Sequence, residues 1–177
     1  MDFRQNYFEL FALPVGFEIE LDVLSKRYQE LQRTLHPDKF VNASERERRI
    51  SLQQAAQVNS AFQTLKDPMA RARYLLELRG FGMSDENTTI RDPEFLEQQM
   101  ELREELAEIK HNNDPSARLA EFVRQLNQST RACVEQLKKN FAVADEASLA
   151  QCQMTVHQLQ FLYRLRQEAE VLEDELL

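Results

Sequence analysis

The sequence is poor in glycine, has no tryptophan and contains no long apolar run. Only three of its 177 residues are glycine, whereas Leu, Glu, Gln, Ala and Arg recur throughout, and this composition favours helices over strands. No stretch approaches the roughly 20 apolar residues needed to span a bilayer. The first residues lack the basic start and the small-residue cleavage pattern of a secretory signal. We therefore expect an all-α, cytoplasmic protein that makes no membrane contact.

Cysteine is also scarce. Cys133 and Cys152 are the two cysteines, and neither belongs to a CxxC pair or has a histidine at ligand spacing. Isolated cysteines in apolar helical stretches are usually small buried hydrophobic residues. We expect no disulfide in a reducing compartment, no metal site and no cofactor.

The net charge of −8 is unevenly distributed along the chain. Residues 1–80 hold 12 Lys and Arg against 11 Asp and Glu, whereas residues 81–177 hold 10 against 19. Nucleic-acid binding needs basic residues that neutralise phosphates, so the acidic second half argues against it. The asymmetry also indicates two modules with different partners.

Helix starts are marked by an Asp-Pro pair that occurs three times, each time before an amphipathic run. Asp accepts a bond from a free helical N–H, and proline at the first position gives up a donor that has no partner there. The pairs are Asp67-Pro68, Asp92-Pro93 and Asp114-Pro115. Apolar spacing extends the prediction to the whole chain. The predicted helices span about 6–11, 21–35, 44–65, 68–80, 93–111, 115–140 and 145–176.

Two all-helical domains follow from this order. The segment 81–91 is rich in Gly, Ser, Asp, Asn and Thr and is typical of a linker. We predict an N-terminal domain at 1–80, built on a helical hairpin with short flanking helices, and an antiparallel three-helix bundle at 92–177. Apolar residues at spacings of three and four predict the inward face of the second helix. These are Leu21, Leu24, Tyr28, Leu31 and Leu35. In the fourth helix, Leu75, Leu76 and Leu78 are available for packing.

Two motifs of the first domain resemble those of the J domain. The tripeptide His36-Pro37-Asp38 follows the amphipathic second helix. Further on, VNSAFQTLKDP (58–68) is similar to the J-domain pattern N-x-A-[FY]-x-x-L-x-[DN]-P, and an R-x-x-Y sequence closes at Tyr74. The tripeptide alone has little specificity. Together, and separated by a helix of the right length, the two motifs are strong evidence for a J domain.

The resemblance implies how the first domain acts. J domains dock the second helix and the loop after it on the ATPase of a DnaK-type chaperone and trigger ATP hydrolysis there. The tripeptide His36, Pro37 and Asp38 would make the stimulatory contact. A basic group, mostly on the water-facing side of the second helix, would form an electrostatic dock. This group comprises Lys26, Arg27, Arg33 and Lys39.

These residues allow two other interpretations. Without the tripeptide, basic residues on a helix exterior are usually an ordinary solvated face. His36 and Asp38 also suggest a catalytic dyad. We discount the dyad because the proline between them sets the turn, and because no nucleophile, Gly-rich phosphate loop or metal-ligand cluster accompanies them. We therefore expect no enzyme activity.

The helix predicted from Pro93 carries apolar residues on two faces. At about 100° per residue, one narrow arc must face the core. This arc comprises Phe95, Leu102, Leu106 and Ile109. Leu96 and Met100 project to nearly the opposite side, among carboxylates. Such a pair is common on ordinary surfaces, but it also has the make-up of a small binding patch.

A J domain followed directly by an acidic three-helix bundle resembles the HscB family, co-chaperones of iron–sulfur cluster assembly. The likeness covers essentially the whole chain, including IRDPEFLEQQMELREELAEI (90–109) and QFL (160–162), which matches an R-F-L element. The resemblance implies that the bundle binds the scaffold IscU and that the J domain presents it to the chaperone HscA. The scaffold contacts would be Leu96, Glu97, Met100, Glu101, Glu104 and Phe161. Glu97 departs from an apolar position of the family, and the sequence does not fix the exposure of Phe161.

A general J protein that serves unfolded clients is the competing hypothesis. Such proteins usually add a Gly/Phe-rich linker and a zinc-ribbon or β-rich client domain, and neither composition occurs here. Some members of the resembled family, chiefly eukaryotic, carry paired CxxC motifs for zinc, which this sequence lacks. We expect a monomer with two protein partners, an HscA-type ATPase chaperone and an IscU-type scaffold.

Overall fold

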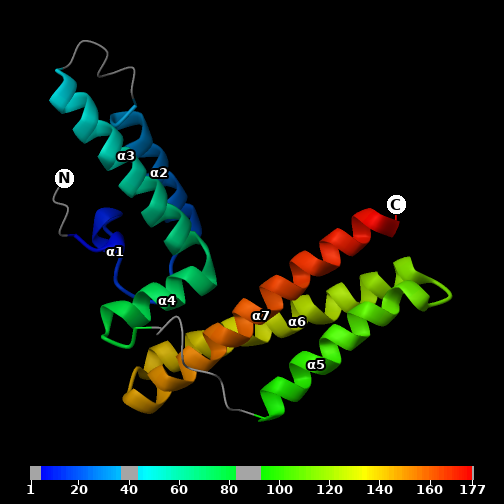
Figure 1. Ribbon diagram of the computed structural model, residues 1–177. Helices are drawn as coiled ribbons and strands as arrows, with labels where there is room; N and C mark the ends of the chain where they lie inside the picture. Colours follow the sequence, from blue (N-terminus) through cyan, green and yellow to red (C-terminus); the bar gives the residue numbers. More distant parts are fainter. Residues whose placement is uncertain (1–4, 37–43, 83–92, 177) are drawn as a thin grey trace. The chain divides into compact units, whose positions relative to one another are not determined.

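The computed structural model describes residues 5–36, 44–82 and 93–176, and no strand occurs in these ranges (Figure 1). The all-α prediction is confirmed. None of the described helices is both long and apolar enough to cross a membrane. The helices are α1 (Tyr7–Leu10), α2 (Leu21–Thr34), α3 (Glu45–Lys66), α4 (Pro68–Leu78), α5 (Pro93–Glu108), the 3₁₀ turn η2 (Ile109–His111), α6 (Pro115–Val143) and α7 (Glu146–Leu176).

The chain divides into two compact units, Met1–Leu75 and Leu76–Leu177. Each unit has its own buried residues. The predicted domain boundaries at 80 and 92 stay predictions. Most of the predicted linker, residues 83–91, lies outside the described residues.

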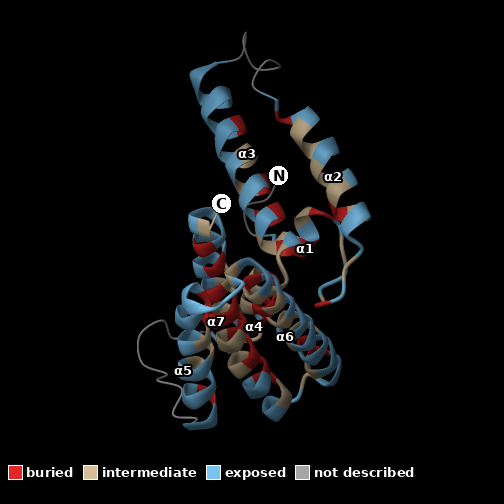
Figure 2. Cartoon of the chain, turned by 90° about the vertical axis from the view of Figure 1, so that its right-hand side faces the viewer, coloured by how far each residue is buried: buried red, intermediate tan, exposed pale blue. Residues whose placement is uncertain are grey.

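The first unit is built on a hairpin of α2 and α3, whose facing sides carry buried residues (Figure 2). The Tyr28 ring stacks on the Phe62 ring, with centroids 4.0 Å apart. Beside this stack, the Tyr28 hydroxyl donates to the side-chain oxygen of Asn59 at 3.0 Å. Closer to the loop, the buried Ser51 hydroxyl donates to the Leu35 carbonyl at 3.2 Å. Stacking and hydrogen bonds thus hold the two helices together up to the end of α2.

Two predicted inward residues are exposed. Leu21 is 48% exposed, whereas Leu24, one turn later, is fully buried. Leu21 is the first residue of α2, and helical side chains lean toward the N-terminus, so this one projects past the end of the helix. Leu78 ends α4 and is also exposed, because Leu75 and Leu76 occupy the buried side of that helix.

Two of the three predicted Asp-Pro caps are confirmed at atomic detail. The Asp67 carboxylate accepts a bond from the Ala70 N–H at 2.7 Å, at the start of α4. Asp114 accepts from the Ala117 N–H at 3.0 Å, at the start of α6. The third helix, α5, begins at Pro93 as predicted, but Asp92 lies outside the described residues.

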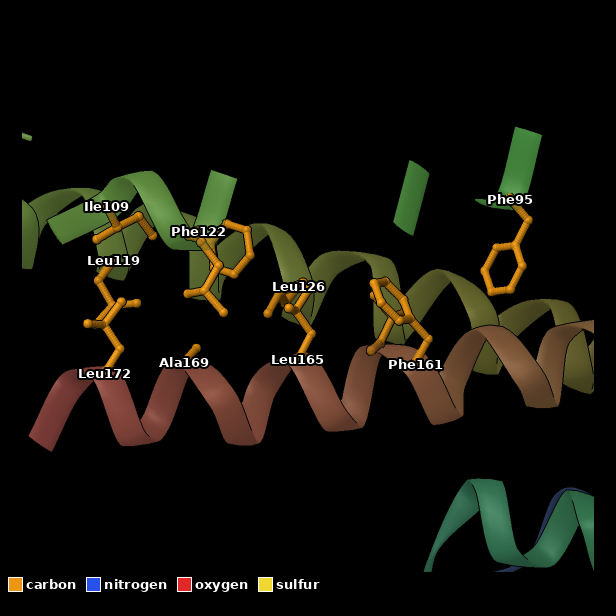
Figure 3. Close-up of a cluster of buried hydrophobic side chains, with 11 residues drawn as sticks. Phe95, Ile109, Leu119, Phe122, Leu126, Phe161, Leu165, Ala169 and Leu172 are labelled. Carbon is orange, nitrogen blue, oxygen red and sulfur yellow. The ribbon is translucent and has the colours of Figure 1, made fainter. Parts of the chain in front are cut away.

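The second unit contains a three-helix bundle of α5, α6 and α7, and Figure 3 shows side chains of all three helices meeting along one apolar seam. Along α7, four apolar residues spaced by three and four positions are buried, and Leu176, which continues the same spacing, is half-buried. The buried four are Leu162, Leu165, Ala169 and Leu172. The structure extends α6 three residues beyond the predicted end. It closes at Ala144, which has a left-handed φ of 56° and donates to the Asn140 carbonyl at 2.8 Å.

Arg27 was predicted to face solvent as part of the basic dock, and this placement is wrong. Its side chain is half-buried, and its guanidinium donates to the carbonyls of Phe11 and Ala12. Ala12 has a left-handed φ of 49° just after α1. A helix as short as α1 leaves its last carbonyls without intrahelical partners, and Arg27 satisfies two carbonyls there. Periodicity within α2 carries no information about this contact between distant segments.

Replacement of Arg27 by methionine tests this role, because methionine keeps an apolar stem and removes the donors. We expect Arg27→Met to lower the free energy of unfolding by about 1–2 kcal/mol, since two carbonyls lose a charged donor. Lys26→Met, at an exposed neighbour, should change it by less than about 0.5 kcal/mol. Urea denaturation measures both values. Equal small effects would contradict a structural role for Arg27.

Candidate functional site

The first candidate surface begins where α2 ends. Leu35, the C-cap residue of α2, is buried, and its carbonyl accepts a hydrogen bond from the Ser51 hydroxyl. His36, directly after it, is exposed. The anchored Leu35 therefore sets the direction in which the chain leaves the hairpin. Pro37, Asp38 and Lys39 lie outside the described residues, so their predicted role stays a prediction.

The basic residues predicted on α2 differ in their exposure to solvent. Lys26 and Arg33 are both exposed, as the inward apolar face of α2 requires. Arg27 is engaged by the carbonyls after α1 and does not offer a free guanidinium to a partner. The exposed cations that α2 contributes near the loop are thus fewer than the sequence predicted.

The second candidate surface lies on α5 and is named here the α5 face: Leu96, Glu97, Met100, Glu101 and Glu104. All five residues are exposed, and Leu96 and Met100 are large apolar side chains with 46% and 63% of their surface in water. The opposite side of α5 carries the buried Phe95 and Leu106. The predicted division of this helix into a core side and an exposed apolar pair is therefore confirmed.

An acidic groove of about 380 Å³ borders the α5 face. Glu97 and Glu101 of the α5 face line it together with Glu94 of the same helix. Gln158 of α7 forms part of its wall, a contribution that sequence reasoning missed because α7 is far away in the chain. Three carboxylates beside an apolar pair suit a partner that presents a basic group next to an apolar one.

Phe161 does not share the exposed surface. It is 8% exposed and belongs to the core of the bundle (Figure 3). Its ring meets the Phe95 ring edge-on at 84°, with centroids 6.2 Å apart, and the Arg103 guanidinium carbon lies 5.7 Å from the ring centre. Phe161 therefore supports α5 from beneath, and its side chain is not available to a partner in the way that Leu96 and Met100 are.

The two cysteines are unpaired, and both are protonated at neutral pH. Burial raises the pKa of the Cys152 thiol to about 11 and also raises the pKa of the half-buried Cys133. The thiolate is the form that binds metals and attacks electrophiles, so neither residue is poised for such chemistry. Within the described ranges, no group of three His, Cys, Asp or Glu residues is arranged to hold a metal ion.

The difference between Phe161 and Met100 can be measured as stability. Phe161→Ala should lower the free energy of unfolding by about 3–5 kcal/mol, because it empties a site in the bundle core. Met100→Ala should change it by no more than about 0.5 kcal/mol, because the side chain is already in water. Guanidinium denaturation of both variants provides the comparison. A large loss for Met100→Ala would mean that α5 is rotated about its axis.

Sequence comparisons identify the family. Residues 91–170 match the domain family described as the HSCB C-terminal oligomerisation domain. The co-chaperone protein HscB homolog of Shewanella halifaxensis is 46% identical over 171 residues, which cover 97% of this chain and 98% of that protein. The homolog from Vibrio cholerae is 45% identical over 172 residues, 97% of this chain and 99% of that protein.

Solved structures agree with the sequence comparison. The chaperone HscB from Vibrio cholerae superposes with a TM-score of 0.88 at 43% identity, over 98% of this chain and all of that one. The human co-chaperone protein HscB has the same fold, with a TM-score of 0.86 at 24% identity over 98% of this chain and 84% of that one. Relatives this similar, over nearly the full length, settle membership. The chain belongs to the HscB family of co-chaperones.

Proposed function

We propose that this co-chaperone binds an IscU-type scaffold through the α5 face, brings it to an HscA-type ATPase chaperone and stimulates ATP hydrolysis by that chaperone. Family membership supports the general role, assistance to a chaperone in the maturation of iron–sulfur proteins. The observation that carries the scaffold side is the exposed pair Leu96 and Met100, set among carboxylates on a helix whose other side is buried.

The α5 face fits a protein partner better than a small molecule. Exposed apolar side chains flanked by charges form the usual centre and rim of a protein interface. The pair would lose its water on binding, while Glu97, Glu101 and Glu104 remain near the edge and select a basic partner surface. Phe161 contributes indirectly, because its contact with Phe95 helps to hold α5 in place.

The chaperone side is assigned to the end of the α2–α3 hairpin. His36, Pro37 and Asp38 would make the stimulatory contact, with Lys26, Arg33 and Lys39 as the electrostatic dock. The exposure of His36, Lys26 and Arg33 supports this assignment. Arg27 acts in the proposal only by fixing α1 to the hairpin. The chain then works by binding and presentation, and no residue of its own has to carry out a chemical step.

A single substitution in the tripeptide tests the chaperone side. His36→Gln should abolish stimulation of the partner's ATPase, because it removes an exposed contact residue, while the thermal unfolding curve stays unchanged. The matched control is His111→Gln, since His111 is an exposed histidine of the second unit. The readout is steady-state phosphate release by the HscA-type chaperone. Full stimulation by His36→Gln would refute the assignment.

A double substitution tests the scaffold side. Loss of two apolar contacts at the centre of an interface costs about 1–2 kcal/mol each, so Leu96→Ala with Met100→Ala should weaken scaffold binding about 30- to 1,000-fold. Val143→Ala with Val171→Ala is the control, because both valines are exposed elsewhere on the bundle. Isothermal titration against a purified IscU-type scaffold gives the affinities. Equal affinities for the two double variants would remove the α5 face from the proposal.

A further inference from the structure

The outer side of α3 begins with a group of arginines that sequence reasoning did not use. Arg46, Arg48 and Arg49 lie in the first five residues of the helix, and all three are exposed. Together with Glu45 and Leu52 they line one open depression of the surface. None of the three arginines has a carboxylate partner in the described part of the chain.

These arginines stand at an unfavourable place for the free protein. The N-terminal end of a helix carries a partial positive charge, so cations there reduce helix stability. Two acids share this first turn, Glu45 and Glu47. The Glu47 carboxylate is already used, because it accepts bonds from the hydroxyl and backbone N–H of Ser44, which lower its pKa. Glu45 is then one carboxylate beside three arginines, so the positive charges of this turn are in excess and an acidic partner would offset their cost.

An exposed leucine lies among them. Leu52 is 60% exposed and follows Arg48 and Arg49 by four and three residues, which places it beside both on the helix surface. Burial of this leucine would favour association, and the surrounding cations would select the partner.

We propose that Arg46, Arg48, Arg49 and Leu52, here called the α3 surface, form a second docking surface for the same ATPase chaperone, against an acidic area of it. The inference rests on the proposed function. The α3 surface starts two residues after Ser44, and the tripeptide precedes Ser44 by six residues in the sequence. Lys26 and Arg33 on α2 have the same sign of charge, so one acidic partner can cover both helices.

The test measures ATPase stimulation against co-chaperone concentration. Arg48→Gln with Arg49→Gln should raise the half-saturating concentration about tenfold at low salt and leave the maximal stimulation unchanged. The reason is that the two positive charges speed the association of the co-chaperone with an acidic surface. The difference should shrink at high salt. Arg131→Gln with Arg164→Gln is the matched control: it removes two exposed arginines of the second unit and should behave like the parent protein.

A second pair of variants tests the apolar part. Leu52→Ser should raise the half-saturating concentration several-fold without lowering the melting temperature, whereas Val143→Ser, at a similarly exposed residue, should not. If the parent protein stimulates the ATPase but the α3 variants have unchanged half-saturation, the α3 surface is refuted and the proposed function stands. If the parent gives no stimulation, both fall together.

Self-association is the remaining occupant to be distinguished. The acidic second unit of another copy has the opposite charge to the α3 surface. Sedimentation velocity of the parent and of the Arg48→Gln, Arg49→Gln variant decides between the two. A concentration-dependent dimer that only the parent forms would overturn the assignment to the chaperone, and identical monomers would support it.

Discussion

A helix that buries one side in a core has no freedom over what its other side presents, and α5 is governed by this constraint. Phe95, Leu106 and Ile109 each remove most of a large apolar side chain from water. Burial of such a side chain is worth about 1.5–3 kcal/mol, and a rotation that hid Leu96 and Met100 would exchange three buried side chains for two, a net loss of about one such contribution. The exposed apolar pair is thus a fixed feature of the folded chain.

The hairpin of the first unit follows the same logic with polar contacts. Ser51 lies on the core side of α3, where an unpaired hydroxyl would be costly, and its bond to the Leu35 carbonyl removes that cost. The bond also ties down the last peptide before His36. Each candidate surface thus lies beside a rigid support, which is the apolar core beneath α5 and this hydrogen bond at the end of α2.

Local signals in the sequence were sufficient for the helices and for the α5 face. Asp67 and Asp114 cap helices as their Asp-Pro pairs predicted, and periodicity separated the two sides of α5 correctly. Residues whose surroundings come from elsewhere in the chain were not predictable in this way. Arg27 was predicted to be exposed, because its position in α2 does not reveal that its guanidinium bonds to the carbonyls after α1. The burial of Phe161 depends on a contact with Phe95 of α5, which is distant in the sequence.

The capping box at the start of α3 has a consequence for positions 37–43, which precede it in the sequence. The side chains of Ser44 and Glu47 each accept a bond from the other's backbone N–H, which caps the start of α3. The Ser51 hydroxyl donates to the Leu35 carbonyl and so caps the end of α2. The caps of both helix ends are therefore made by residues outside positions 37–43. The stability of the hairpin should therefore depend little on which residues occupy those positions.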